Sequence, residues 1–188
     1  MKKASVLLSA LLCLSLFSCS TPTAHIIITP ELLNTEHSAY TNKSSQFSIK
    51  DMRTTRHLVQ ILRQGEAADL ISAQQPLTDI ISISLLNNVK QQGLMINKAA
   101  SNKFQLFIDK ALITVNQNLM SYQADNIINL RVKITNDQQT LTKDFTIKGN
   151  SQGPLTADPA VLARDFNQQL STLLSRIVNN QEIQHFIL

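Results

Sequence analysis

The middle of this chain alternates apolar and polar residues over three successive stretches, and this pattern restricts the fold more than any other feature. Apolar residues alternate with polar ones across residues 104–115, 128–134 and 141–147, with Lys143 as the one exception on the apolar side of the last stretch. Because side chains along a strand point alternately to opposite faces, each stretch predicts a strand with one buried face. The alternation in the first stretch changes phase near Asp109 and Lys110, which predicts a β-bulge there. Together the three stretches predict an antiparallel meander.

Two further segments have the spacing of amphipathic helices. Pro76 is suited to begin the first helix and Gly93 to end it, while Asp158 is suited to cap the second ahead of Pro159. Their apolar faces comprise Leu77, Ile80, Ile81, Leu85 and Val89 in the first helix and Leu162, Phe166, Leu170, Leu173 and Ile177 in the second. Such faces can be buried only against the sheet.

Residues 25–29 and 46–50 predict two more strands, and residues 57–62 and 68–72 predict a hairpin around a turn at 63–66. The spacing of apolar residues in 57–62 also fits a helix. Residues 149–156 contain a Gly-Pro pair and predict a loop. We therefore expect an α+β fold of two layers, in which an antiparallel sheet carries both amphipathic helices on one face.

The N-terminus has the features of a bacterial secretory signal. Lys2 and Lys3 precede an apolar run over residues 4–17 that is too short to span a bilayer permanently, because a spanning helix needs about 20 residues. The sequence Leu-Phe-Ser-Cys ending at Cys19 resembles the lipobox, although Phe17 departs from it, and an ordinary signal peptide cut elsewhere is the alternative. We expect residues 1–18 to be a lipoprotein signal peptide, residues 19–24 a lipidated N-terminus with a short tether, and residues 25–188 a single periplasmic α+β domain.

Lipid on Cys19 is the one site that the sequence predicts, and the partner that it implies is a membrane. Several acyl chains hold a protein stably on a bilayer, whereas one chain holds it only marginally. Cys13 leaves with the signal, so no disulfide is expected. In the lipoprotein class that this N-terminus resembles, Asp after the cysteine marks the inner membrane, so Ser20 points to the periplasmic face of the outer membrane. The five-residue tether reaches at most about 17 Å, which keeps the domain near that surface.

The composition disfavours nucleic acid, and the motifs disfavour catalysis. Of 17 basic residues two leave with the signal, so 15 face 13 acidic ones without a basic stripe. The histidines at 25, 37, 57 and 185 lack metal-site spacing, and there is neither a G-x-S-x-G motif nor a glycine-rich phosphate loop. We therefore predict no enzyme, no metal and no cofactor.

Three features have both a functional and a structural interpretation. Asn126 interrupts the buried register of its strand, so it is either a ligand contact or, as we favour, a strand end or a satisfied polar group. Asp51 and Arg53 are expected to form a surface pair of little consequence. The apolar C-terminus, with Ile183, Phe186, Ile187 and Leu188, either docks on the core or contacts a partner.

The layout resembles the YajG family of outer-membrane lipoproteins of Gram-negative bacteria. The resemblance rests on these parts of the sequence: the lipobox at Leu16–Cys19, the early strand with Pro30, Asp51-x-Arg53-Thr54, the helix end at Gly93-Leu94-Met95-Ile96, the long strands over 104–134 and Ile183-x-His185-Phe186-Ile187. The resemblance implies a localisation and a fold. It implies no activity, because no activity is established for the family.

The leading functional prediction is a non-catalytic, lipid-anchored periplasmic binding or scaffold protein, by analogy an accessory subunit of an envelope complex with a protein partner. A regulator of cell-wall synthesis is the alternative, which the short tether disfavours. An envelope hydrolase is the third option, and it lacks a recognisable set of catalytic residues.

Overall fold

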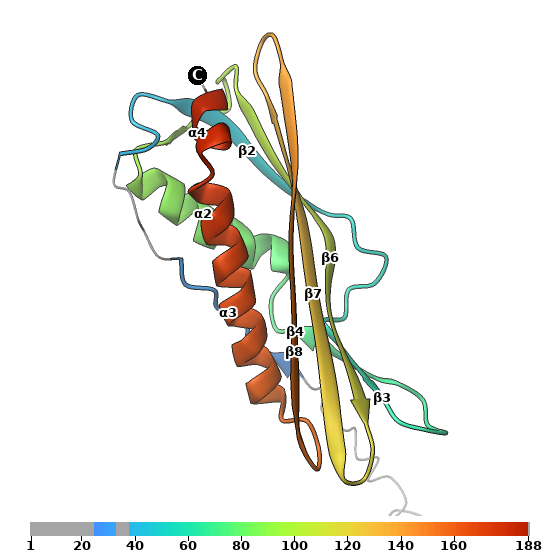
Figure 1. Cartoon of the computed structure of the whole chain (residues 1–188). Helices are drawn as coiled ribbons and strands as arrows, with labels where there is room; N and C mark the ends of the chain where they lie inside the picture. Colours follow the sequence, from blue (N-terminus) through green and yellow to red (C-terminus); the bar gives the residue numbers. More distant parts are fainter. Residues whose placement is uncertain (1–24, 33–37, 188) are drawn as a thin grey trace, which may run out of the picture.

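The computed structural model describes residues 25–32 and 38–187, so the predicted signal peptide, Cys19, the tether, His37 and Leu188 lie outside the described residues. The elements are β1 (His25–Ile26), β2 (Ser44–Asp51), β3 (Val59–Leu62), β4 (Asp69–Ala73), α2 (Leu77–Gln91), β5 (Met95–Ile96), β6 (Lys103–Gln117), β7 (Ser121–Thr135), β8 (Thr140–Pro154), α3 (Pro159–Val178) and α4 (Gln181–Phe186). Most of the ordered structure is therefore strand (Figure 1).

The eight strands form one mixed sheet around β6. β7 runs antiparallel along one edge of β6, and β8 runs antiparallel along β7. On the other edge of β6, β2 pairs with the first half and β3 with the second half, both in the parallel sense. β4 is antiparallel to β3, whereas β1 is parallel to β4 and β5 is parallel to β2.

The predicted architecture, a two-layer α+β fold with an antiparallel sheet and two packed helices, is wrong. The protein is mostly β, its curled sheet contains parallel and antiparallel pairs, and the described residues include three helices. Between β2 and β6 the chain runs through the β3–β4 hairpin and α2, and such long connections allow parallel pairing. Apolar alternation identifies the buried face of a strand, but it carries no information about the neighbouring strand or its direction.

The antiparallel meander and its bulge are confirmed. The register between β6 and β7 shifts between Ile108 and Lys110, at the predicted phase change. The hairpin of β3 and β4 is also confirmed. The loop predicted at 149–156 is wrong over residues 149–154, because β8 continues through both of its glycines to Pro154. Proline is tolerated there because β8 is an edge strand and Pro154 is its last residue.

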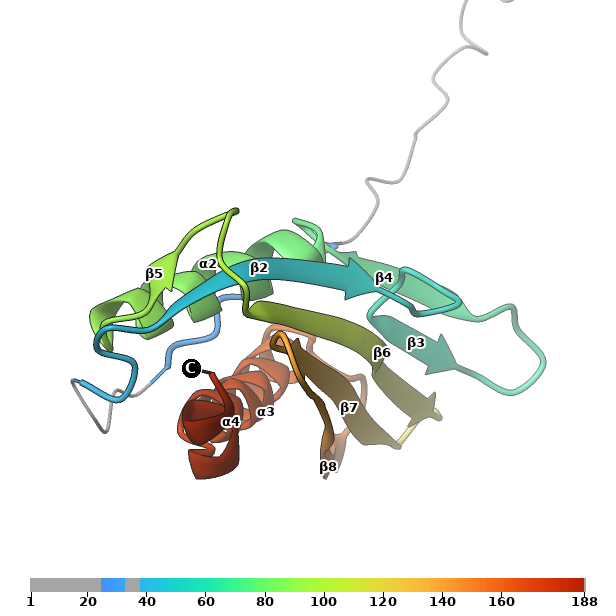
Figure 2. The ribbon, with the colours of Figure 1, turned by 90° about the horizontal axis from the view of Figure 1, so that it is seen from above.

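The predicted end of the first helix and the predicted start of the second are confirmed, and Pro76 directly precedes α2 as its N-cap. Gly93 takes a left-handed φ of 95° just after α2, and the Leu94 amide donates back to the Val89 carbonyl over 2.9 Å. At the start of α3, the Asp158 side chain accepts a hydrogen bond from the Ala160 amide. Helix α3 then lies along the concave side of the curled sheet (Figure 2).

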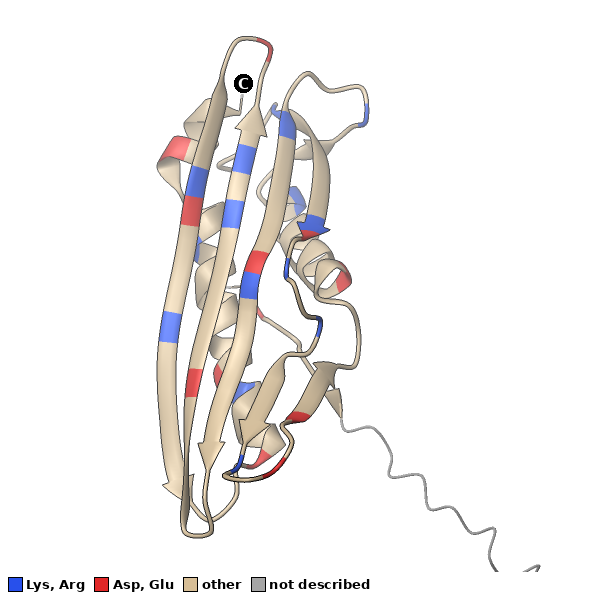
Figure 3. Ribbon diagram, turned by 90° about the vertical axis from the view of Figure 1, so that its right-hand side faces the viewer, with Lys and Arg blue, Asp and Glu red and all other residues tan. Residues whose placement is uncertain are grey.

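The core lies between the sheet and the helices. The inner faces of β6 and β7 bury aliphatic side chains against α3, and α2 packs against β2 and α3. Ile183 and Ile187 at the C-terminus are 0% exposed, so the interpretation that this segment docks on the core is confirmed for the described residues. The opposite face of the sheet, which faces the viewer in Figure 3, has no helix across it.

Candidate functional site

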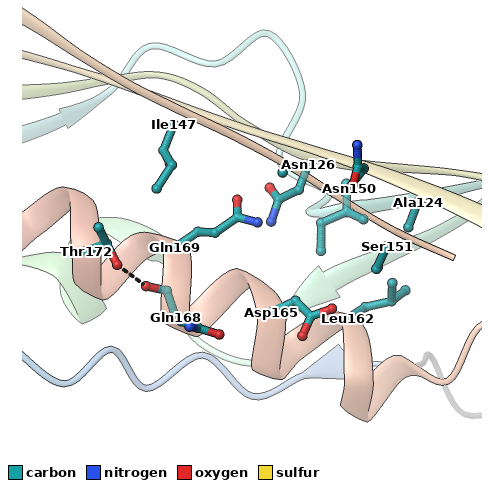
Figure 4. A pocket seen from close by; sticks show the side chains of 12 residues that line it. Ala124, Asn126, Ile147, Asn150, Ser151, Leu162, Asp165, Gln168, Gln169 and Thr172 are labelled. Carbon is teal, nitrogen blue, oxygen red and sulfur yellow. Dashed lines mark hydrogen bonds between the residues drawn. The ribbon is translucent and has the colours of Figure 1, made fainter.

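A cavity of about 400 Å³ lies between α3 and the inner faces of β7 and β8 (Figure 4). We call it the α3–β8 cavity. It is lined by Ile113, Ala124, Asn126, Ile147, Gly149, Asn150, Ser151, Leu162, Asp165, Gln168, Gln169 and Thr172. A volume of this size is within the range of small-molecule sites, which start near about 300 Å³.

The strand registers and the helix period bring the polar residues of this cavity together. Asn126 pairs in register with Ile113 and with Gly149, so its side chain shares the inner face of the sheet. It is only 7% exposed. From the opposite wall, Asp165, Gln169 and other residues of α3 face the cavity at three- and four-residue spacing.

Two amide oxygens in the cavity are buried without a hydrogen-bond partner in the described structure, namely Asn126 Oδ1 and Gln169 Oε1. Figure 4 shows the two amide groups pointing toward one another from β7 and α3. A buried polar atom without a partner costs about 1–3 kcal/mol. A hydrogen-bond donor that reached these two oxygens would remove this cost, which suits the site to a neutral molecule with hydroxyl or amide groups.

Gly149 makes room for the Gln169 side chain. A Cβ atom built on Gly149 would lie 2.0 Å from Gln169 Nε2, well inside van der Waals contact. The backbone of Gly149 does not have a positive φ, so a glycine is required here by space rather than by conformation. The end of the Gln169 side chain therefore occupies the space that a side chain at position 149 would take.

The structure decides in part whether Asn126 is a ligand contact, a strand end or a satisfied polar group. Its inward orientation was predicted, but it lies inside β7 rather than at a strand end, and its Oδ1 is unsatisfied in the described residues. Gln169 and Gly149 were missed. A signal for Gln169 was present, because it follows Phe166 by three residues and precedes Leu173 by four, inside the apolar face of α3.

Asp51 and Arg53 form an ion pair, but the prediction of a surface pair is wrong. Their side chains are 6% and 7% exposed, and Arg53 donates from Nε and Nη2 to the two carboxylate oxygens over 3.0 and 2.8 Å. Arg53 also donates to the Ala111 carbonyl, beside the bulge of β6. Burial raises the pKa of Asp51, but the hydrogen bonds and charge of Arg53, with the charge of Arg56, outweigh it and hold this pKa below its usual value. The pair thus connects the end of β2 to β6.

The other titratable residues do not assemble into a recognisable centre. Within residues 25–32 and 38–187, no three His, Cys, Asp or Glu side chains are grouped so that they could hold a metal ion. His25 and His185 are exposed, and His57 is half-buried. None of the helices in the described part of the chain is long and apolar enough to span a membrane.

The described structure is that of a β-rich domain with a curled mixed sheet, a helix on its concave side and a polar cavity between them. The family model Lipoprotein_16, whose description is "Uncharacterized lipoprotein", matches residues 30–188. The chain belongs to this family, in agreement with the predicted resemblance to YajG. It is therefore a lipoprotein, a class of protein that is anchored to membranes of the envelope through lipid. Among curated proteins, no sequence matches this chain at a significant level.

Solved structures resemble this protein to different degrees. Protein XCC0632 from Xanthomonas campestris is 17% identical, with a TM-score of 0.59 over 85% of this chain and 95% of that one. A neuraminyllactose-binding hemagglutinin homolog from Helicobacter pylori is 9% identical, with a TM-score of 0.43 over 81% and 94%. Protein CT253 from Chlamydia trachomatis is 9% identical, with a TM-score of 0.36 over 77% and 98%. At these identities only the first similarity is close enough to indicate a common fold, and it says nothing about activity.

Proposed function

We propose that this protein is a non-catalytic binding lipoprotein, anchored through acyl chains on Cys19 to the periplasmic face of the outer membrane. The α3–β8 cavity is its binding site, and its ligand is a small neutral molecule rich in hydroxyl or amide donors. The observation that carries this proposal is a cavity lined by Asn126 and Gln169, whose amide oxygens are buried and have no hydrogen-bond partner in the described structure.

The chemistry around the cavity supports binding rather than turnover. Among the described residues, Asp165 is the only charged side chain that lines it, and Arg164 donates two hydrogen bonds to one oxygen of that carboxylate. Neither histidine nor cysteine is among the described lining residues, and the one carboxylate that could serve as a base, Asp165, is held by Arg164. Amide groups are well suited to orient a neutral ligand, because each can donate and accept hydrogen bonds.

Ligand binding can be tested by thermal unfolding of the mature protein in detergent, with glucose, N-acetylglucosamine, trehalose and glycerol as probes. A probe at one hundred times its Kd stabilises the folded state by about 2.7 kcal/mol. For a domain of this size that corresponds to a rise in Tm of about 5–10 °C. Absence of any shift with these donor-rich neutral probes would count against the cavity as their site.

Variants make the binding test specific. We expect Asn126→Leu to abolish the shift while leaving the free protein as stable as before or more so, because the substitution removes an unsatisfied buried oxygen. Asn129→Ser is the control. Asn129 lies on the same strand as Asn126, but its side chain is on the opposite face of the sheet and outside the cavity lining. A shift that survives Asn126→Leu, or that Asn129→Ser removes equally, contradicts the proposed site.

Anchoring is tested separately by cell fractionation. We expect Cys19→Ser to move the protein from outer membranes to the soluble periplasmic fraction, because the acyl chains are then absent. A Cys19→Ser protein that still sediments with outer membranes would show that lipid is not the anchor.

A further inference from the structure

One end of the molecule exposes three large apolar side chains. Leu119 and Met120 in the turn between β6 and β7 are 92% and 78% exposed, and Leu155, directly after β8, is 63% exposed. The backbones of the two segments are joined, because the Leu155 amide donates to the Met120 carbonyl over 2.8 Å. We call these three residues the apolar tip.

The local backbone holds the apolar tip in place. Asn118 Oδ1 accepts hydrogen bonds from the amides of Met120 and Ser121, each over 2.8 Å. Leu155 has a φ of 61°, a left-handed conformation that favours glycine or asparagine. A leucine in this conformation is strained, and its side chain is mostly exposed rather than buried in the core. The strain therefore points to a use for this side chain outside the domain.

The two segments that form the apolar tip carry no charge, and described charges lie close by on the β3–β4 hairpin, where Arg63 lines a pocket with Met120 and pairs with Asp69 and Glu66. Residues 116–124 and 149–157 contain no Lys, Arg, Asp or Glu. Figure 3 shows the ends of β6, β7 and β8 around the tip free of charged residues, whereas charges are spread along the strands away from it. Because an ionised group is costly to remove from water, uncharged turns can enter a bilayer surface at a much lower cost.

The position of the tip matches the length of the tether. His25 of β1 pairs with Ser72 of β4. The residue before Ser72, Ile71, pairs with Val59 of β3, and Val59 pairs with Ile113 of β6. His25 therefore lies about one residue from the level of Ile113, at the level of Leu112. From Leu112 to the end of β6 at Gln117 is five residues, or about 17 Å of strand. The five residues between Cys19 and His25 also reach at most about 17 Å. A fully extended tether therefore brings Cys19 to about the level of the end of β6, next to the turn that carries Leu119 and Met120.

We propose that the apolar tip inserts into the surface of the bilayer that holds the acyl chains of Cys19, as a second membrane contact. This proposal rests on the proposed lipid anchor. With the tip in the membrane, the turn between β7 and β8 and the C-terminal helix α4 face away from it, because they lie at the other end of the long strands (Figure 1). The lipid gives attachment, and the tip gives orientation.

Depth-dependent fluorescence quenching tests this contact in the full mature lipoprotein. The protein is reconstituted into vesicles of phosphatidylethanolamine and phosphatidylglycerol that contain brominated lipids, with one fluorophore attached at Leu119→Cys. The matched label is at Asp137→Cys, in the turn at the opposite end. We expect brominated lipids to quench the label at position 119 at least fivefold more strongly than the label at position 137. Equal quenching, or quenching at neither position, would overturn the proposal.

Substitutions separate insertion from proximity. With the label at Leu155→Cys, Leu119→Ser with Met120→Ser should reduce the quenching at least threefold, because the adjoining apolar side chains are gone. Ile83→Ser is the control, because Ile83 is 58% exposed on α2 and outside the tip. Quenching that is unchanged by the tip substitutions contradicts insertion. Energy transfer between labelled copies that rises with protein density, without quenching by lipid, would instead identify a second copy as the partner of the tip.

Failure of the lipid anchor can be distinguished from failure of the tip. If mass spectrometry shows an unmodified residue 19, the anchor is wrong, and the tip is then judged by flotation of the full-length Cys19→Ser protein with vesicles. Flotation that falls at least tenfold after Leu119→Ser with Met120→Ser supports the tip. Absence of flotation in the parent protein overturns it.

Discussion

Replacement of Gly149 by alanine should disturb the cavity through one contact. The added Cβ would lie 2.0 Å from Gln169 Nε2 and 2.9 Å from Gln169 Cδ. Because ordinary contact requires about 3.4 Å, the amide must move by roughly 1.4 Å, and overpacking of this kind costs about 1–3 kcal/mol. Alanine also restricts the unfolded chain, which returns about 0.5 kcal/mol. We expect Gly149→Ala to lower the free energy of unfolding by about 1–2 kcal/mol.

A double-mutant cycle with Gln169→Ala isolates this contact. Gln169→Ala removes the amide that alanine at 149 would displace, so in this background Gly149→Ala should be neutral or stabilise by about 0.5 kcal/mol. Urea unfolding of the four proteins, followed by circular dichroism, gives the coupling energy, which we expect to be about 2 kcal/mol. Additive effects, with a coupling energy below about 0.5 kcal/mol, would refute the argument that Gly149 exists to admit Gln169.

Three further changes test other parts of the fold by urea unfolding. Tyr40→Phe should cost about 1 kcal/mol, because the buried hydroxyl donates to the Val178 carbonyl over 2.8 Å, and an unchanged stability would contradict that role. The lowered pKa of Asp51 means that its ion pair stabilises the fold fully above about pH 5 and progressively less as pH falls below the ordinary value near 3.9. Asp51→Asn should therefore lower stability at pH 7 and flatten this acid dependence, whereas an unaltered slope would count against the pair. Gly93→Ala should cost about 2 kcal/mol, because a φ of 95° and a loop backbone 3.1 Å from the new Cβ both oppose it. The control Gly65→Ala, with a φ of 78° and open space, should cost only about 1 kcal/mol, and equal costs would show that crowding at Gly93 has no effect.

The local structure of this protein could be predicted where a single segment contains the whole signal. The bulge at Ile108–Lys110 follows from the phase change of one strand, and the start of α3 follows from Asp158 and its neighbours. Likewise, Gly93 takes a left-handed φ just after α2, and this conformation ends the helix. In each case the energies that decide the structure come from neighbours in the sequence.

The pairing of strands far apart in sequence could not be predicted in this way. The parallel contacts of β2 and β3 with β6 depend on how the chain returns through α2, and no residue of β2 encodes that path. Residues 149–154 were predicted as a loop because glycine and proline usually interrupt strands. Here the absence of a side chain at Gly149 serves the contact with Gln169, which is visible only once α3 lies against β8.

The candidate site was predicted in part for the same reason. The inward position of Asn126 follows from the register of its own strand. Its relation to Gln169 depends on the packing of α3 on the sheet, and therefore could not be derived from either segment alone. The burial of the pair formed by Asp51 and Arg53 was missed because it results from the neighbouring strand β6.

Lipid on residue 19 determines where the domain sits, how far it can move and which surface the apolar tip can reach. The mass of the N-terminal peptide of the mature protein, purified from outer membranes, decides this point. We expect the peptide to begin at Cys19 and to carry the mass of attached acyl chains. A free thiol at Cys19, or a mature protein that retains residues 1–18, would contradict the anchor and the orientation that depends on it.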